Sequence, residues 1–463
     1  GKDLPSSNVL HEGPPMRLGA NNHFIGSHVL VPKRGVALHI NAFNFPMWGM
    51  LEKFAPSFLA GMPCLVKPAT ATSYVAEACV RLVVDSGLVP EGALQLIIGG
   101  TGDLFERLDE ADVVTFTGSA DTALMLKAHP NLLKKSIPFN AEADSLNCAI
   151  LAPDVTPDDP EFDLFIKEVA REMTAKAGQK CTAIRRTLVP RHLTDAVATA
   201  LKARLSKTVV GDPAVEGVRM GALASKAQQA DVAERVALLA RGCEVLLSER
   251  DGFSPRGQGV ADGAFVAPTL LLAHNSAASD AHHVEAFGPV TTLMPYGDFE
   301  EALHLATLGR GSLVGTVCTK TPALAAQAVP TFAAWHGRML VLDREAALEN
   351  TGHGSPLPKL KHGGPGRAGG GEELGGLRAV KHYLQRCAVQ GSPTMISAVT
   401  GEYQRGGAVT ESEIHPFRRY FEDVEVGMSL LTHRRTVGEA DIVAFGGLSG
   451  DYFYMHFDEI AAA

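Results

Sequence analysis

A free thiol is the reactive group that this sequence offers most directly. The 463 residues include seven cysteines, no two of which form a Cys-x-x-Cys pair. This number is too small and odd for a disulfide framework, so a functional cysteine would act as a thiol. Near pH 7 a thiolate is the best side-chain nucleophile for a carbonyl carbon. One of the seven, Cys181, stands in Gly178-Gln179-Lys180-Cys181-Thr182-Ala183, and a cysteine taken alone is more often a buried, inert side chain.

Predicted helices and strands flank the Cys181 segment and two other polar segments. A predicted amphipathic helix over 162–176 runs directly into the Cys181 segment. Asn41-Ala42-Phe43-Asn44-Phe45-Pro46-Met47-Trp48 and Phe116-Thr117-Gly118-Ser119 each lie at a strand-to-helix turn. Loops at such turns are the usual place for binding and catalytic residues.

The order of the elements predicts an α/β fold. Strands are expected over 36–40, 63–67, 94–98, 113–117 and 148–151, with helices over 48–59, 74–84 and 120–129. This alternation is typical of βαβ units and a parallel, nucleotide-compatible sheet. A second α/β region adds helices over 162–176 and 224–239 and strands over 244–247 and 265–269, after which the pattern weakens. Residues 390–413 are polar and weakly patterned, which indicates a linker.

Composition narrows the function classes. The hydrophobic fraction of 46% excludes large-scale disorder, and 42 basic against 51 acidic residues give a net charge of −9 with no local basic stripe. We therefore expect no nucleic-acid partner. There is no apolar run of membrane-spanning length and no secretory signal at the first residues, so we expect no membrane association and a cytoplasmic location.

Five motifs occur together in one order. They are Asn41–Trp48, Lys67-Pro68-Ala69, Phe116–Ser119, Gly178–Ala183 and Glu285-Ala286-Phe287-Gly288-Pro289. The set resembles the aldehyde dehydrogenase superfamily over roughly residues 15–385. The resemblance implies a Rossmann-like cofactor domain joined to an α/β catalytic domain.

The resemblance also implies catalytic roles. An aldehyde hydrogen leaves as hydride only after a nucleophile has made the carbonyl carbon tetrahedral, which would be the work of Cys181. Asn44 would donate a hydrogen bond to the resulting oxyanion. Glu142 would activate the water that hydrolyses the thioester, although Glu-Ala-Asp-Ser replaces the family's usual Glu-Leu-Gly-Gly at this place.

Cofactor residues are implied in the same way. Lys67 would bind the adenosine ribose, Ser119 would lie near the pyrophosphate, Glu285 would bind the nicotinamide ribose and Phe287 would pack beside the nicotinamide. Phe116 and Gly118 belong to the same turn as Ser119. Thr70 stands where NAD-preferring relatives carry a glutamate that would repel a 2′-phosphate, so we expect NADP rather than NAD, with NAD possible. No metal is expected, since the neighbours His282 and His283 would point to opposite faces of an extended segment.

The last stretch resembles a second family. Residues 421–427, 436–442 and 449–456 are similar to the opening third of MaoC-like hotdog hydratases, whose Asp and His, here Asp451 and His456, address one water over an acyl-CoA double bond. The order of the two parts resembles the bifunctional ring-cleavage enzymes of bacterial phenylacetate degradation. This implies hydrolysis of oxepin-CoA followed by oxidation of 3-oxo-5,6-dehydrosuberyl-CoA semialdehyde.

The expected organisation has five parts. They are an N-terminally incomplete cofactor-binding domain over 1–145, with an oligomerisation hairpin near 13–33, a catalytic domain over 146–355, a return and oligomerisation segment over 356–389, a linker over 390–415 and an incomplete hotdog domain over 416–463. We expect a homo-oligomer, as in both families. A general or CoA-acylating aldehyde dehydrogenase and an inactive structural or binding protein are the alternatives.

Overall fold

The chain divides into two compact units. One comprises residues 1–14 and 27–389, and the other comprises residues 15–26 and 390–463. The computed structural model describes residues 8–21, 23–249, 252–408 and 438–450. Asp451 and His456 therefore lie outside the described residues.

A five-stranded parallel sheet forms the first α/β region. Its order is β5 (Leu94–Leu96), β4 (Cys64–Lys67), β3 (Ala37–Ile40), β6 (Val113–Thr117) and β7 (Phe139–Glu142). Helices α1 (Trp48–Leu59) and α2 (Ser73–Asp85) share one core cluster with Ala37, whereas α3 (Leu104–Arg107), α4 (Ala120–Lys127) and α5 (Pro130–Lys134) share another with Leu38. Because successive strand residues point to opposite faces, the sheet is covered on both sides.

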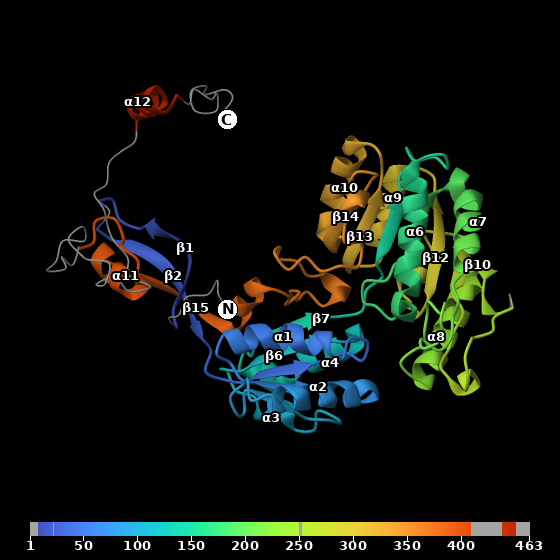
Figure 1. Cartoon of the computed structure of the whole chain (residues 1–463), viewed down its shortest axis with the longest axis horizontal. Helices are drawn as coiled ribbons and strands as arrows, with labels where there is room; N and C mark the ends of the chain where they lie inside the picture. The colour runs from blue at the N-terminus through green and yellow to red at the C-terminus, as the bar shows by residue number, and fades with distance from the viewer. Residues whose placement is uncertain (1–7, 22, 250–251, 409–437, 451–463) are drawn as a thin grey trace. The chain divides into compact units, whose positions relative to one another are not determined.

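A seven-stranded sheet forms the second α/β region. Its order is β10 (Cys243–Leu247), β11 (Thr269–Ala273), β12 (Val290–Tyr296), β9 (Arg186–Pro190), β8 (Cys148–Leu151), β13 (Ser312–Cys318) and β14 (His336–Leu342). Only the β10–β11 pair is antiparallel. Helices α6 (Pro160–Thr174) and α7 (Thr194–Leu205) cover one face, and α8 (Lys226–Leu239), α9 (Phe299–Thr307) and α10 (Pro322–Trp335) cover the other (Figure 1).

The remaining described elements are few. Strands β1 (Leu10–Arg17), β2 (Ile25–Pro32) and β15 (Leu384–Gly391) form a three-stranded sheet in the order β1-β2-β15. Helix α11 (Pro393–Thr400) lies within the segment that we interpret as a linker, so that segment has regular structure of its own. Helix α12 (Glu439–Ser449) lies in the stretch that resembles hotdog hydratases.

Most strands and helices agree with the sequence-based expectation, with two exceptions. The strand expected over 265–269 is wrong, because β11 begins only at Thr269 and the carbonyls of Ala264 and Phe265 accept hydrogen bonds from Leu223 and Gln229 instead. The expected weakening of regular structure after residue 269 is also wrong. Strands β12, β13 and β14 follow, and β12 and β13 are buried on both faces, so they show no polar alternation to reveal them.

The parallel sheet places the chemistry at one edge. Parallel strands end on the same side of their sheet, and here β3, β6 and β7 end at Ile40, Thr117 and Glu142. The turns that follow carry Asn44 and Ser119. In open α/β sheets ligands bind outside these carboxyl ends, so the sheet topology brings these residues to one site.

Gly178 gives a direct test of how the Cys181 turn is packed. A methyl group there would lie 2.1 Å from the carbonyl oxygen of Gly288, and its φ is +69°, whereas Gly259 has φ +68° and no atom within 4 Å of that methyl position. We expect Gly259→Ala to lower the free energy of unfolding by about 1–2 kcal/mol through its left-handed backbone. Gly178→Ala should cost about 3 kcal/mol or more, because the backbone must also shift. Urea denaturation measures both, and equal losses would contradict the packing argument.

Candidate active site

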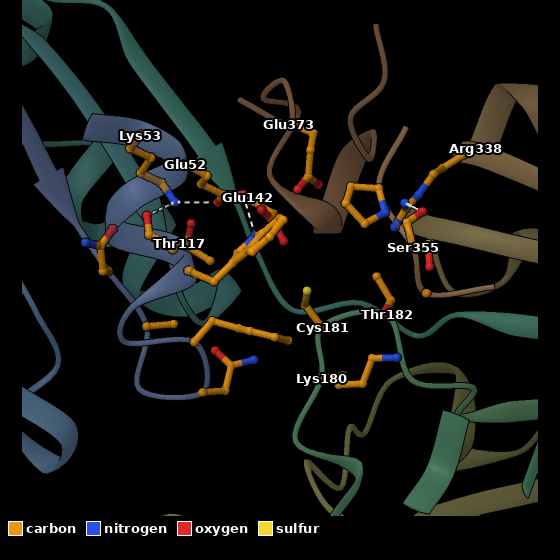
Figure 2. A pocket seen from close by; sticks show the side chains of 18 residues that line it. Glu52, Lys53, Thr117, Glu142, Lys180, Cys181, Thr182, Arg338, Ser355 and Glu373 are labelled. Atoms are coloured by element: carbon orange, nitrogen blue, oxygen red, sulfur yellow. Dashed lines mark hydrogen bonds and ion pairs between the residues drawn. The ribbon is translucent and has the colours of Figure 1, made fainter. Parts of the chain in front are cut away.

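Two cavities meet at Cys181. The smaller, about 300 Å³, is lined by Cys181, Glu142 and Asn44 together with Glu52, Lys53, Thr117, Lys180, Thr182, Arg338, Ser355 and Glu373 (Figure 2). The larger, about 860 Å³, is also lined by Cys181 and Asn44. The structure therefore brings the three catalytic candidates together, with the thiol at the boundary between the cavities.

The turn that carries Cys181 has an unusual backbone. Helix α6 ends at Thr174, and the next residues include Lys176, Ala177 and Gly178 with φ values of 52°, 52° and 69°. Left-handed backbone is uncommon outside glycine and costs free energy at Lys176 and Ala177. The turn brings Cys181 back toward the end of β7 rather than continuing along the helix.

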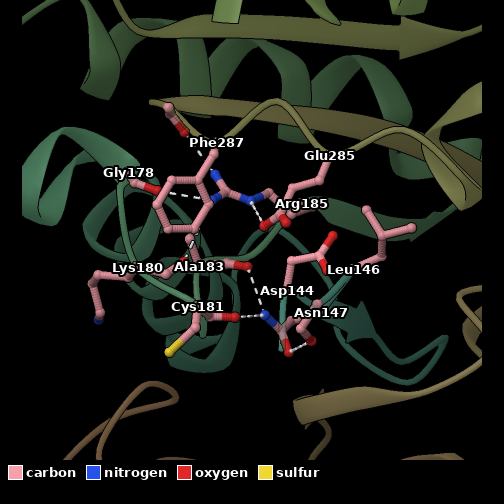
Figure 3. A network of polar contacts seen from close by, with 12 residues as sticks. Asp144, Leu146, Asn147, Gly178, Lys180, Cys181, Ala183, Arg185, Glu285 and Phe287 are labelled. Atoms are coloured by element: carbon pink, nitrogen blue, oxygen red, sulfur yellow. Dashed lines mark hydrogen bonds and ion pairs between the residues drawn. The ribbon is translucent and has the colours of Figure 1, made fainter. Parts of the chain in front are cut away.

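Buried side chains hold this turn from behind. The Asn147 side chain donates hydrogen bonds to the carbonyl oxygens of Cys181 (2.8 Å) and Ala183 (3.1 Å), as Figure 3 shows. The Arg185 guanidinium donates to the carbonyl oxygens of Gly178 (2.8 Å) and Gly288 (2.6 Å). The thiol is thus presented from a backbone fixed on its inner side.

Asn44 lies against the same turn. Its Nδ2 donates a hydrogen bond to the carbonyl oxygen of Gln179 at 3.1 Å. A side-chain amide carries two N–H donors, so the second donor is available to an oxygen in the cavity. This geometry suits the oxyanion role expected for Asn44.

Three carboxylates gather beside the thiol. One oxygen each of Glu52, Glu142 and Glu373 lies within 4.8 Å of the others, and Lys53 Nζ lies 3.1 Å from Glu52 Oε1. Burial and the Glu52 charge raise the pKa of Glu142, and Lys53 acts in the opposite direction. Burial and Glu142 likewise raise the pKa of Glu373. A buried carboxyl with a raised pKa suits a group that takes up a proton near neutral pH.

The charge environment of Cys181 is mixed. Burial, Glu142 and Glu373 raise the pKa of the thiol, whereas Arg338 lowers it. The thiol also interacts directly with Glu142 through a side-chain hydrogen bond. A carboxylate that accepts this proton would generate the thiolate.

The larger cavity contains most of the expected cofactor residues. It is lined by Lys67, Phe116, Gly118, Ser119, Glu285 and Phe287, whereas Thr70 is exposed on the short 3-10 helix Thr70–Thr72 and does not line it. Its volume is in the range of small-molecule sites. Among the lining groups, Lys67 supplies positive charge, Phe287 an aromatic face and Glu285 a carboxylate, so the donor set fits a phosphate-bearing dinucleotide.

Ser119 caps a helix at this cavity. Its Oγ accepts a hydrogen bond from Thr122 N at 3.3 Å at the start of α4, where Gly118 and Ala120 also line the cavity. A helix N-terminus favours negative charge, which agrees with the expected pyrophosphate position. Gly118 is required for packing, because a methyl group there would lie 2.5 Å from the Phe116 ring.

Glu285 is already engaged by a residue of the Cys181 turn. Arg185 Nε lies 3.1 Å from Glu285 Oε1, and both side chains are buried. Burial outweighs this partner and raises the pKa of Glu285 to about 7. The Arg185 guanidinium also stacks over the Phe287 ring at 5.3 Å, so the Glu285 segment and the Cys181 turn form one packed unit (Figure 3).

The adjacent histidines His282 and His283 have different surroundings and do not form a metal-binding pair. His282 is buried, and its two ring nitrogens are bonded to Arg186 Nη1 (3.0 Å) and to the carbonyl oxygen of Ser276 (2.7 Å). His283 lines the larger cavity. Among the described residues, the only group with metal-ligand spacing is the three glutamates, and Lys53 already contacts one of them.

Comparison with known proteins settles the family. Residues 16–388 match the aldehyde dehydrogenase family model. This chain belongs to the aldehyde dehydrogenase family. It is 48% identical over 366 residues to 3,4-dehydroadipyl-CoA semialdehyde dehydrogenase of Aromatoleum evansii, covering 79% of this chain and 71% of that protein. It is 56% identical over 246 residues to Protein MaoC of Klebsiella aerogenes, covering 53% of this chain and 72% of that protein.

Solved structures of aldehyde dehydrogenases confirm the fold. Betaine aldehyde dehydrogenase from Staphylococcus aureus, in complex with NAD+, aligns with a TM-score of 0.70 at 21% identity over 84% of this chain and 74% of that one. Lactaldehyde dehydrogenase from Escherichia coli aligns with the same TM-score at 24% identity over 82% and 74%. None of the helices in the described ranges has the length and apolar character that crossing a membrane requires.

Several residues of this aldehyde dehydrogenase site escaped the sequence analysis. Lys53 could have been found from its spacing, since it lies one helical turn after Gly49 on the helix that follows Asn44, and both line the cavity. Glu373 was hidden in a glycine-rich segment, and it reaches the site because Gly371 N donates to the carbonyl oxygen of Ala141. Arg338, on β14, and Asn147, directly before β8, gave no local signal, because neither belongs to a recognisable motif.

Asn147 provides a test of how the nucleophile is held. Asn147→Ala would leave the carbonyls of Cys181 and Ala183 and the N–H of Val314 without their partner. We expect the free energy of unfolding to fall by about 3 kcal/mol and kcat to fall by about tenfold or more, because the thiol loses its fixed position. As a control, Asn131→Ala removes a side chain that donates to three carbonyls of residues lining neither cavity, and it should lower stability without lowering kcat. Unchanged kcat in Asn147→Ala would contradict the positioning role.

Proposed function

We propose that this aldehyde dehydrogenase oxidises a CoA-linked semialdehyde to its acid with NADP, and that its MaoC-like part hydrolyses the CoA-linked ring that yields the semialdehyde. The two most informative relatives support the proposal, since one is named for a CoA-linked semialdehyde and the other is Protein MaoC. Oxepin-CoA and 3-oxo-5,6-dehydrosuberyl-CoA semialdehyde are the proposed substrates. The observation on which the reaction rests is that Cys181 and Asn44 line both cavities, while Glu142 lines only the smaller one.

The first half of the reaction uses the boundary position of the thiol. Glu142 takes the proton of Cys181, and the thiolate adds to the aldehyde carbon. The free N–H of the Asn44 side chain stabilises the oxyanion, an interaction that in comparable sites contributes about 3 kcal/mol to the transition state. NADP, when bound in the larger cavity, would accept the hydride that leaves the tetrahedral carbon.

The second half takes place on the opposite side of the thiol. The acyl group is then a thioester of Cys181. Glu142 first releases to solvent the proton that it took from the thiol, and it then accepts a proton from the water that attacks the thioester. The C–S bond breaks, the acid is released and the thiol is restored. The balance is aldehyde, NADP+ and water giving acid, NADPH and a proton. Burial raises the pKa of Glu142, which favours proton uptake by this carboxyl, and Lys53 opposes the shift and favours release of the proton.

Two other readings remain distinguishable by experiment. A CoA-acylating enzyme would release the thioester with free CoA, and the buried Glu142 beside Cys181 argues against it because that carboxyl is placed to activate water. Product analysis with and without free CoA decides between acid and acyl-CoA. A binding protein without catalysis would leave the Cys181 thiol inert to iodoacetamide and unprotected by NADP.

The hydratase assignment concerns residues outside the described part of the chain. We propose that Asp451 and His456 address the water that opens the ring, as the resemblance implies. The proposed homo-oligomer and cytoplasmic location also stay predictions.

The nucleophile is tested together with the proposed hydratase residue. Cys181→Ala should abolish NADPH formation from a CoA-linked semialdehyde, because no thiohemiacetal can form. Asp451→Asn should spare this activity and stop ring hydrolysis. Absorbance at the NADPH band and chromatography of the CoA esters measure the two steps. Continued NADPH formation in Cys181→Ala would overturn the mechanism.

Cofactor choice is tested at Thr70. Thr70→Glu places a carboxylate where a 2′-phosphate is expected, so kcat/KM with NADP should fall at least tenfold through repulsion. The value with NAD should stay the same or rise. Steady-state rates with each cofactor measure the ratio, and Ser73→Glu, one helical turn further on, serves as a charge-matched control. An unchanged NADP/NAD ratio in Thr70→Glu would exclude this site as the determinant.

A further inference from the structure

Arg338 is a buried cation without an ion-pair partner among the described residues. It lies on β14, only 8% exposed, and it lines the smaller cavity. Its Nη1 donates to the carbonyl oxygen of Ser355, and its buried Nε has no hydrogen-bond partner in the described part of the chain. A buried charge in this condition lowers stability unless a nearby group compensates for it.

The other buried arginines near the site are satisfied. Arg186 is fully buried, yet all three of its nitrogens are hydrogen-bonded, to three carbonyl oxygens and to His282. Arg185 is paired with Glu285 and bonded to carbonyl oxygens. The structure could have satisfied Arg338 in the same way, so a buried Nε without a partner, on a side chain that lines a cavity, indicates a functional use.

Three carboxyl groups line the cavity around Arg338. Glu52, Glu142 and Glu373 face it, and only Lys53 offsets them directly, from the side of α1. Figure 2 shows Arg338 and Ser355 on the side of the cavity opposite Lys53 and Glu52, with Cys181 between the two groups. A thiolate formed at Cys181 adds a further negative charge in this confined space.

We propose that Arg338 is a positioning residue that holds positive charge opposite the carboxylates and thereby supports the Cys181 thiolate. This inference rests on the proposed function, because it assumes that Cys181 is the nucleophile. Arg338 acts through the field of its guanidinium and does not exchange a proton, since arginine stays protonated in proteins. Its role is therefore separate from that of Glu142, which accepts the proton.

The remaining charged neighbours do not replace Arg338. Lys180, on the same turn as Cys181, is paired with Glu172 at 2.7 Å. Burial lowers the pKa of His353 well below its usual value, so this histidine, which is bonded to Thr316, stays neutral. Lys53 is engaged by Glu52. Arg338 is thus the cation, among the described residues lining this cavity, that lacks a carboxylate partner of its own.

The test is the pH dependence of the thiol itself. We would measure the rate of alkylation of Cys181 by iodoacetamide between pH 6 and 10, without cofactor, using mass spectrometry of the Cys181 peptide to separate it from the exposed Cys387. The alkylation rate rises with pH as the thiol loses its proton, and the midpoint of this rise reports the pKa of Cys181. Arg338→Met and Arg338→Gln should raise this midpoint by about one pH unit or more and leave the rate at high pH unchanged. Arg338→Lys should keep the midpoint near that of the unmodified protein.

Two neutral variants keep the test decisive. Arg338→Met replaces an unpaired buried charge with an apolar side chain of similar length, a change that buried sites tolerate well, so it should fold even if Arg338→Gln does not. The loss of Arg338 also raises the pKa of Glu142, so the measurement is repeated in a Glu142→Gln background, where the upward shift of the midpoint should persist. Arg204→Gln, on the exposed side of α7, is the control and should change nothing.

The outcomes separate this inference from the proposed function. An unmoved midpoint in the neutral variants, or a raised KM for the semialdehyde with an unchanged midpoint, would overturn the role of Arg338 and leave the function intact. A lowered rate at every pH with no shift would show a structural role only and also overturn it. If Cys181 of the unmodified protein does not react at any pH, the proposed function itself fails.

Discussion

The left-handed turn after α6 is the constraint on which the site depends. A helix that continued past Thr174 would direct residue 181 along its own axis, whereas the positive φ values at Lys176, Ala177 and Gly178 turn the chain back toward the parallel sheet. Such a backbone costs about 1–2 kcal/mol at each non-glycine residue. It persists because Asn147 and Arg185 bind its carbonyl oxygens and because Gly178 packs directly on Gly288.

The contacts that hold the Cys181 turn also connect it to the residues lining both cavities. Arg185 connects the turn to Glu285 and Phe287, which line the larger cavity, while Asn44 connects it to the turn after β3. The thiol is therefore fixed relative to both cavities by one set of buried hydrogen bonds. Small displacements of the turn would affect cofactor binding and carbonyl addition together.

Charge in the smaller cavity is balanced between opposite sides. Burial and neighbouring carboxylates raise the pKa values of Glu142 and Glu373, and Lys53 and Arg338 oppose this effect from α1 and β14. Neither cation belongs to the turn that carries the thiol. The chemistry consequently depends on elements separated by almost three hundred residues, which meet only when both sheets have formed.

The sequence by itself determined the family, the set of candidate residues, and strands β3, β4, β5, β6 and β8 with helices α1, α2 and α4, but not β7, α3 or α5. Short apolar runs and turn motifs are local, so Cys181, Asn44, Glu142 and Lys67 were visible without a structure. The later strands were missed because strands buried on both faces show no alternation. Only the tertiary structure decided that Arg338, Glu373 and Asn147 belong to the site and that Glu285 pairs with Arg185, because burial and charge pairing arise from contacts between distant segments that no local pattern records.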